Sequence, residues 1–294
     1  MLGSVGFAAV MLSQVDWGNT FSVLQSTPLS ILATAILATC FSFCGLAAYD
    51  VIAVRHLGLR GVTNLRAATA GAVGYGVSNF MGLPWVTGAL ARQAFYRETG
   101  AGLGPLTTVV MASWVAFWAS AVVIIGIVLV VRPDITAHLD LPVRGAGLGI
   151  VLLTAVAILM FWLSRGRRIR VRGQMLELLG WRVTLLQCGA ALTDLAGSAA
   201  VLFVFLPPGV AGDAASFFGL FVVAVGFGVL SHVPAGLGAF EGTMLLGLHE
   251  ADRTGITSAL VLYRLCRTVL PFLIASAVLG AFVLARQDRA QSPR

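Results

Sequence analysis

The amino-acid sequence predicts an all-α polytopic membrane protein with about six membrane-spanning helices and two re-entrant helical hairpins. Of its 294 residues, 58% are hydrophobic and only 11% are charged, and the mean hydropathy is +0.93. Soluble domains carry about a quarter charged residues, so this chain could not cover a water-facing surface. Several apolar runs also reach the ~20 residues that a helix needs to cross a bilayer. Breaks within two of these runs predict the hairpins.

Eight apolar segments follow one another along the chain, and the third and seventh are interrupted by glycine, proline and polar residues. The third contains GYGVSNFMGLPW and the seventh contains SHVPAGLGAFEG. Backbone groups freed by Gly and Pro cannot face lipid, because each unsatisfied group costs several kcal/mol. We therefore expect both segments to be re-entrant, with tips at Asn79, Pro84, Pro234, Gly236 and Gly238. The segments lie near 1–14, 28–54, 67–90, 107–131, 146–164, 176–206, 216–248 and 257–285.

A short motif recurs in the two halves of the chain and indicates an internal duplication. CGLAAYD ends at Asp50 and CGAALTD ends at Asp194, with Cys, Gly, Ala and Asp at the same spacing. Together with one interrupted segment in each half, this predicts an inverted repeat within a single transmembrane domain. Repeat one is expected to cover residues 1–145, repeat two residues 146–285, and a cytoplasmic tail residues 286–294.

The arginines support this arrangement. All 19 basic residues are arginine, and the net charge is +7. With both termini cytoplasmic and two re-entrant segments, thirteen arginines fall on the cytoplasmic side and three on the outer side, as the positive-inside rule requires. Eight simple crossings would instead separate Arg55, Arg60 and Arg66 from the RGRRIRVR run. Because this excess marks topology, we expect no nucleic-acid partner. The cytoplasmic set is Arg55, Arg60, Arg66, Arg92, Arg97, Arg165, Arg167, Arg168, Arg170, Arg172, Arg286, Arg289 and Arg294, and the outer set is Arg132, Arg144 and Arg253.

Enzymatic and metal chemistry find little support in the sequence. The four cysteines lie in apolar runs without CxxC spacing, and the four histidines are scattered and lack HExxH spacing. Ser231, His232 and Glu241 lie near one another, but neighbouring side chains point apart and GxSxG is absent, so a hydrolase triad is disfavoured. We expect no catalytic residue, no cofactor and no metal.

Charged residues inside apolar segments are the candidate binding groups. A charge within a membrane helix costs at least a few kcal/mol, so its presence indicates a function or a partner. Two simpler readings compete: Asp50 could be an interfacial carboxylate near Arg55, and Arg264 could extend to the membrane surface. The candidate substrate-binding residues are Asp50, Arg92, Asp194, Ser231, Glu241, Tyr263 and Arg264.

Five blocks resemble, in order, the flippase part of the lysylphosphatidylglycerol synthetase/flippase family, the multiple peptide resistance factors. SHVPAGLGAFE with the downstream YR at Tyr263 and Arg264 is the most specific of them. Ala235 departs from the pattern, because the family usually has a second glycine there. Three charged positions of the family's motifs correspond to Asp50, Arg92 and Glu241 in this sequence. The blocks are YDVIAVRHLG, GALARQAFYRETGAGLGPL, LPPGVAGD, SHVPAGLGAFEGTMLLGL and LVLYRLCRTVLP.

The resemblance implies a lipid translocase of the bacterial cytoplasmic membrane rather than an enzyme. It would move aminoacylated phosphatidylglycerol from the inner to the outer leaflet, which lowers the negative surface charge and repels cationic antimicrobial peptides. We expect a translocase module without the transferase domain of the family, either a standalone relative or a fragment, with a separate aminoacyl-lipid synthase as its partner. Arg92 and Arg264 would hold the lipid phosphate, while Asp50, Asp194 and Glu241 would receive ammonium groups.

Two other functions remain compatible with the sequence. An ion-coupled secondary transporter of a small charged solute would have a cavity closed toward lipid. A membrane scaffold for a separate lipid synthase would have its intramembrane charges paired with one another and no polar cavity. Glycine-rich helix faces such as GAVGYG would also allow a homodimer.

Overall fold

The computed structural model confirms an all-α polytopic membrane protein. Five helical stretches are long and apolar enough to span a bilayer: α3 (Leu29–Leu57), α6 (Leu103–Val131), α7 (Gly145–Leu163), α8 (Trp181–Phe205) and the run from α11 to α12. A sixth span was expected at 1–14, which lies outside the described residues. The structure describes residues 22, 25–59, 61–82, 84–96, 103–136, 145–163, 168–171, 174–177, 180–231, 233–248 and 253–291.

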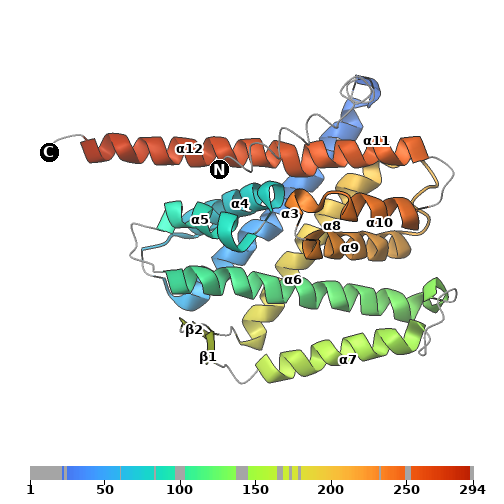
Figure 1. Ribbon diagram of the computed structural model, residues 1–294, viewed down its shortest axis with the longest axis horizontal. Helices are drawn as coiled ribbons and strands as arrows, with labels where there is room; N and C mark the ends of the chain where they lie inside the picture. The colour runs from blue at the N-terminus through green and yellow to red at the C-terminus, as the bar shows by residue number, and fades with distance from the viewer. Residues whose placement is uncertain are drawn as a thin grey trace.

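The two interrupted segments fold as helical hairpins. The first consists of α4 (Asn64–Met81) and α5 (Pro84–Tyr96), and the second of α9 (Ala214–Leu230), the short 3₁₀ turn η3 (Pro234–Gly236) and α10 (Ala239–Gly247). At 1.5 Å per residue, the thirteen residues of α5 and the nine of α10 are too short to cross ~30 Å of hydrocarbon. Figure 1 shows the hairpins entering the bundle from opposite ends and turning back at its centre.

Local signals fix where these helices begin and end. Gly58 terminates α3 in the left-handed region at φ 60°, and its N–H and that of Leu59 return to carbonyl groups of the last turn. Thr63 caps α4, because its side chain accepts a hydrogen bond from the Arg66 N–H. Asp213 caps α9 in the same way through Ser216.

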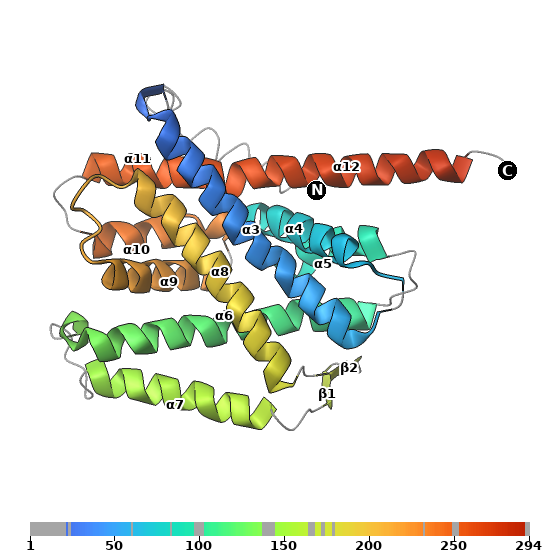
Figure 2. The same cartoon turned by 180° about the vertical axis from the view of Figure 1, so that it is seen from behind.

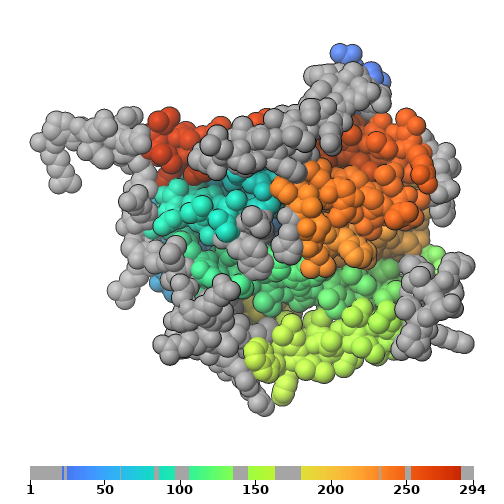
Figure 3. All heavy atoms as spheres, in the orientation of Figure 1, coloured from blue at the N-terminus to red at the C-terminus, as the bar shows by residue number. Residues whose placement is uncertain are grey.

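The hairpin tips touch one another, and glycine makes this approach feasible. Gly82, which has φ 72°, lies so close to the second tip that a Cβ there would be 3.0 Å from Pro234 Cα. A Cβ on Gly236 would be 2.8 Å from Gly228 Cα, so η3 packs directly on the last turn of α9. All the predicted tip positions lie in or beside these turns, and Figure 3 shows both hairpins on the same face of the molecule.

Helices α3 and α8 cross each other and form a layer on the face opposite the hairpins (Figure 2). A Cβ on Gly45 would lie 2.5 Å from the Ala190 carbonyl oxygen, and one on Gly197 would lie 2.7 Å from the Ser42 nitrogen. Small residues at the crossing therefore let the two backbones approach closely, as is common between membrane helices. Figure 2 shows the pair running side by side and diagonally across the other spans.

The elements run in the directions that two inverted halves would give. Helix α3 runs toward the end of the molecule where α12 ends, whereas α8 runs away from it, and α6 and the α11–α12 run also have opposite directions (Figure 1). The α3–α4 connection, the end of α12 and a small β-hairpin share that end, which carries many of the arginines. The repeat boundaries and the cytoplasmic assignment of this end stay predictions.

The β-hairpin is a feature that the sequence analysis did not predict. It pairs β1 (Arg168–Val171) with β2 (Gln174–Glu177) in antiparallel register, with Arg168 opposite Glu177. The predicted span 176–206 accordingly begins as a helix only at Trp181. The final span is also irregular, because α11 (Arg253–Arg264) and α12 (Leu270–Gln291) are joined by a π-helical turn, η5 (Leu265–Val269).

Candidate functional site

A cavity of about 220 Å³ lies where the hairpin tips meet the spanning helices. Aromatic side chains from α3, α4 and α6 line one part of it, and arginines from the α11–α12 run line the other. Val233, beside the second tip, lines the cavity and is 37% exposed. The lining residues that matter below are Tyr49, Tyr75, Asn79, Trp114, Phe117, Asp194, Tyr263, Arg264 and Arg267.

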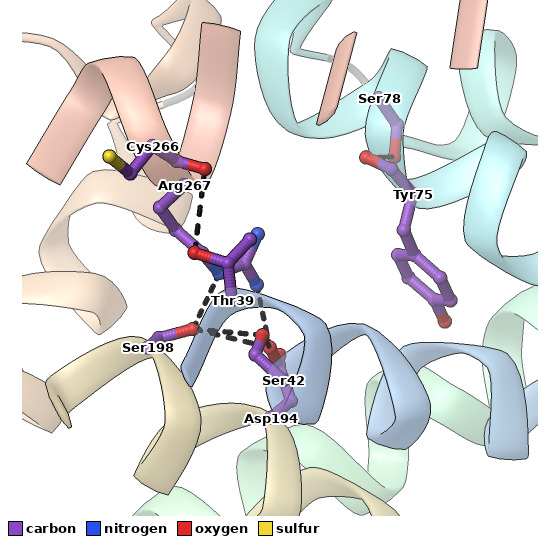
Figure 4. A network of polar contacts seen from close by, with 8 residues as sticks. All are labelled: Thr39, Ser42, Tyr75, Ser78, Asp194, Ser198, Cys266 and Arg267. Carbon is purple, nitrogen blue, oxygen red and sulfur yellow. Dashed lines mark hydrogen bonds and ion pairs between the residues drawn. The ribbon is translucent and has the colours of Figure 1, made fainter. Parts of the chain in front are cut away.

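The first charged group in the cavity is the ion pair between Asp194 of α8 and Arg267 of η5. Arg267 Nη2 donates to Asp194 Oδ1 over 2.6 Å. Ser42 donates to the same oxygen over 2.6 Å, and Ser198 lies 3.3 Å from it while accepting from Arg267 Nε. Figure 4 shows this network on one side of an open space, with the Tyr75 side chain on the other. Asp194 is thus held by several donors on one oxygen.

The π-helical turn places this arginine and its neighbour. Such turns occur mostly as single insertions in α-helices and often at functional sites. Arg267 lies within the turn and Arg264 immediately precedes it, and both line the cavity. The Thr39 hydroxyl group reaches the Cys266 carbonyl oxygen at 3.4 Å, which ties the turn to α3.

The second charged group joins the last span to the second hairpin tip. Arg264 Nε donates to Glu241 Oε1 over 2.6 Å, and Arg264 Nη1 donates to the Ala235 carbonyl oxygen. Glu241 Oε2 accepts from the Gly238 N–H at the start of α10. Arg264 Nη2 contacts Glu241 Oε1 as an ion pair but, within the described part of the chain, makes no hydrogen bond.

Ala235 adopts an unusual backbone conformation at this tip. Its φ is 55°, and it is the only non-glycine residue with positive φ in the part of the chain that the structure describes. This conformation costs an L-residue roughly 1–2 kcal/mol. The bond from Arg264 to the Ala235 carbonyl oxygen holds the strained turn against the cavity wall.

A third ion pair, between Asp50 of α3 and Arg92 of α5, is sealed away from the cavity. The contact is bidentate, with Arg92 Nε 2.7 Å and Nη2 2.9 Å from the two carboxylate oxygens. The side chains are 0% and 2% exposed, and neither lines the cavity. Tyr75 separates them from it, because its ring lies 4.6 Å from the Arg92 guanidinium carbon and also lines the cavity.

The structure therefore brings together only part of the predicted binding set. Asp194, Tyr263 and Arg264 line the cavity, as do the tip residues Asn79 and Gly236, while Glu241 stands behind Arg264. Asp50 and Arg92 bind each other instead, because burial without water requires each charge to have a partner. Ser231 ends α9 and donates to the Gly228 carbonyl oxygen without lining the cavity. His232, the next residue in the sequence, lies outside the described residues.

The sequence analysis missed several residues of this site. Arg267 lies in an apolar segment and satisfies the criterion that selected Asp194, so its charge was the available signal. Tyr49 and Tyr75 carried no such signal, because aromatic residues are common in membrane helices. Ser42 and Ser198 became recognisable only when α3 and α8 were seen to cross.

The fold and the charged cavity define a multi-pass membrane protein with a polar site inside its helical bundle. No family model matches the sequence. The chain is 27% identical to the uncharacterized protein slr0712 of Synechocystis sp. over 97% of its own length and 90% of that protein. It is 24% identical to the inner membrane protein YbhN of Escherichia coli, covering 90% of the chain and 84% of YbhN.

A third similarity is local. The chain is 33% identical over 100 residues to the phosphatidylglycerol lysyltransferase of Bacillus subtilis. This match covers 33% of the chain and 11% of that protein. The two longer matches support a membrane protein of similar size, and the short match links one third of the chain to a protein that is named for lipid chemistry.

Proposed function

We propose that the protein translocates a phospholipid between the leaflets of the inner membrane, with the head group passing through the cavity and the acyl chains remaining in lipid. The observation that carries this proposal is the pair of arginines, Arg264 and Arg267, that line a cavity between two re-entrant tips. The exposed Val233 lines the cavity, and in this proposal the lipid enters beside it. The arginine-rich end would face the cytoplasm, with both termini on that side.

The energetics favour such a passage. A phospholipid head group carries a phosphate whose charge must be desolvated in hydrocarbon. Guanidinium groups bind phosphate through charge-assisted hydrogen bonds, and both Arg264 and Arg267 line the cavity. Rocking of two inverted halves around a central site is a known route for moving a substrate across a membrane.

The resemblance to the lysylphosphatidylglycerol synthetase/flippase family suggests a particular lipid, aminoacylated phosphatidylglycerol. The local similarity to a phosphatidylglycerol lysyltransferase supports this choice, although the lipid-modifying activity is a property of that protein. In this version of the proposal, the chain performs no reaction, a separate synthase supplies the lipid, and export of the lipid contributes to resistance against cationic antimicrobial peptides.

The two competing functions fit the structure less well. A scaffold predicts paired charges without a polar cavity, and the charges are paired but three of them line a cavity. A carrier of a small solute predicts a cavity closed toward lipid, whereas the cavity-lining Val233 is 37% exposed.

A vesicle assay tests the proposal directly. The purified protein is reconstituted into liposomes with a fluorescently labelled phospholipid, and loss of fluorescence after adding a membrane-impermeant quencher reports exchange between leaflets. Wild type should accelerate exchange over empty vesicles, and Arg264→Gln should slow it about tenfold or more through loss of a charge-assisted contact. Gly189→Ala is a matched control, because nothing lies within 4 Å of a Cβ there. Wild-type exchange equal to that of empty vesicles would refute the proposal.

A further inference from the structure

The carboxylates in and behind the cavity lining are already paired with arginines, and this pairing limits which head-group charges the cavity can bind. Asp194 is the one carboxylate among the described lining residues, and its Oδ1 is bound by Ser42, Ser198 and Arg267. Glu241, behind the lining, uses Oε1 for Arg264 and Oε2 for the Gly238 N–H. A lipid with extra ammonium groups would therefore meet carboxylates that are each already paired with an arginine.

One buried donor of the cavity, in contrast, has no acceptor in the described part of the chain. Tyr49 is 2% exposed and lines the cavity, and its hydroxyl group makes no hydrogen bond there. Arg264 Nη2 is ion-paired with Glu241 Oε1 but makes no hydrogen bond in the described part of the chain. Buried polar groups are nearly always hydrogen-bonded in folded proteins. An oxygen atom of a ligand in the cavity would supply the acceptor that the Tyr49 hydroxyl group lacks within the described chain.

The aromatic part of the cavity suits hydroxyl groups better than cations. Tyr49 and Tyr75 lie with ring centroids 5.8 Å apart, and the half-buried amide of Asn79 lies on the same helix as Tyr75. An amide can both donate to and accept from a hydroxyl group. Tyr75 already has the Arg92 guanidinium group on its ring, so an ammonium group there would meet a ring that a cation occupies.

We propose that the head group is anionic and bears hydroxyl groups, as in phosphatidylglycerol, and that it binds better without aminoacylation. This inference rests on the proposed translocation of a phospholipid and replaces the aminoacylated lipid named above with the unmodified one. The phosphate lies at Arg264 and Arg267, and the glycerol hydroxyl groups lie toward Tyr49 and Asn79. Cationic aminoacyl lipids are poorer ligands, because two guanidinium groups line the cavity with a single carboxylate, which is already paired with Arg267.

The test compares lipid binding by the full-length protein in detergent, measured by native mass spectrometry. The probes are phosphatidylglycerol, lysylphosphatidylglycerol and phosphatidic acid, which has the phosphate without the glycerol. Phosphatidylglycerol should bind about tenfold tighter than its lysyl ester, a difference expected for one unpaired charge. Equal or tighter binding of the lysyl ester would overturn the inference.

A tyrosine variant tests the hydroxyl contact separately. Tyr49→Phe keeps the ring and should weaken phosphatidylglycerol binding about five-fold, the value of one hydrogen bond, while leaving phosphatidic acid unchanged. Tyr96→Phe is the matched control, because the Tyr96 hydroxyl group donates to Asp50 outside the cavity. Unchanged phosphatidylglycerol binding by Tyr49→Phe, or equal losses for both lipids, would overturn this assignment.

These results separate the selectivity from the proposed function. Preferential phosphatidylglycerol binding without leaflet exchange in vesicles would refute translocation and leave the selectivity standing. Leaflet exchange that prefers the lysyl ester would support translocation and refute the selectivity.

Discussion

Two regions of this molecule contain the same chemical groups in different surroundings. Asp50 and Arg92 form a sealed pair with side chains 0% and 2% exposed. Arg264 and Glu241, at the cavity, are 17% and 24% exposed and share their contacts with the backbone of a hairpin tip. The difference shows that a charge inside a membrane helix does not by itself indicate a substrate site. Its access to a cavity is the distinguishing property.

Glycine residues explain why the Asp50–Arg92 pair is sealed away from the cavity. A Cβ on Gly71 would lie 2.8 Å from Asp50 Oδ2, and Cβ atoms on Gly74 and Gly88 would each lie 2.9 Å from Arg92 Nη1. The first hairpin thus encloses its arginine with glycine faces and leaves no room for a ligand. The second hairpin presents a strained turn and a cap to Arg264, and these contacts have space beside them.

The largest expected effect is on the sealed pair. Asp50→Asn leaves Arg92 charged, buried and without its carboxylate, which should lower the free energy of unfolding by about 3–5 kcal/mol. Thermal unfolding in detergent measures this loss. The double variant Asp50→Leu with Arg92→Met should lose less than Asp50→Asn, because it removes both charges. A wild-type melting temperature for Asp50→Asn would mean that the pair is not a structural one.

The glycine enclosure provides the next test. Gly71→Ala should lower the free energy of unfolding by about 1–3 kcal/mol, because the new methyl group overlaps the Asp50 carboxylate in a packed site. Gly189→Ala, which meets open space, should be neutral or stabilising by up to about 1 kcal/mol through helix propensity. Equal melting temperatures for the two variants would show that the enclosure is loose.

A substitution in the strained turn at the cavity should stabilise the protein, unlike the two substitutions above. Ala235→Gly relieves the positive φ of 55°, and glycine's freedom in the unfolded chain offsets part of the gain. We expect the free energy of unfolding to rise by up to about 1 kcal/mol. A lower melting temperature for Ala235→Gly would indicate that the alanine side chain supports the cavity wall.

The smallest expected effect on stability comes from Asp213, an exposed residue outside the membrane-spanning segments. Asp213 caps α9 and pairs with Arg132, and hydrogen bonds from Ser216 and then from Arg132 lower its pKa to about 2. A lowered folded-state pKa contributes stability above the ordinary value of 3.8, and this contribution disappears as the pH falls toward 2. Asp213→Ala should therefore lower the melting temperature slightly near pH 6 and hardly at all near pH 2. A deficit that is constant over this range would contradict the assignment.

Much of the fold could be predicted from the sequence, because hydropathy, glycine and proline carry the information. Apolar length identified the spans, and the breaks near Pro84 and Pro234 identified both hairpins. The charge partners could not be predicted, because pairing depends on which helices cross. Arg267 reaches Asp194 only through the π-helical turn, and Arg92 reaches Asp50 only after the first hairpin folds back onto α3.

The central claim is that the substrate meets the cavity arginines and not the sealed one, and conservative variants test it most directly. Arg264→Lys and Arg92→Lys both keep the charge and lose the planar guanidinium geometry. Phospholipid affinity of the folded fraction, measured by native mass spectrometry, should fall about tenfold for Arg264→Lys and stay at the wild-type value for Arg92→Lys, which should only melt earlier. Lost affinity in Arg92→Lys with wild-type affinity in Arg264→Lys would contradict the account.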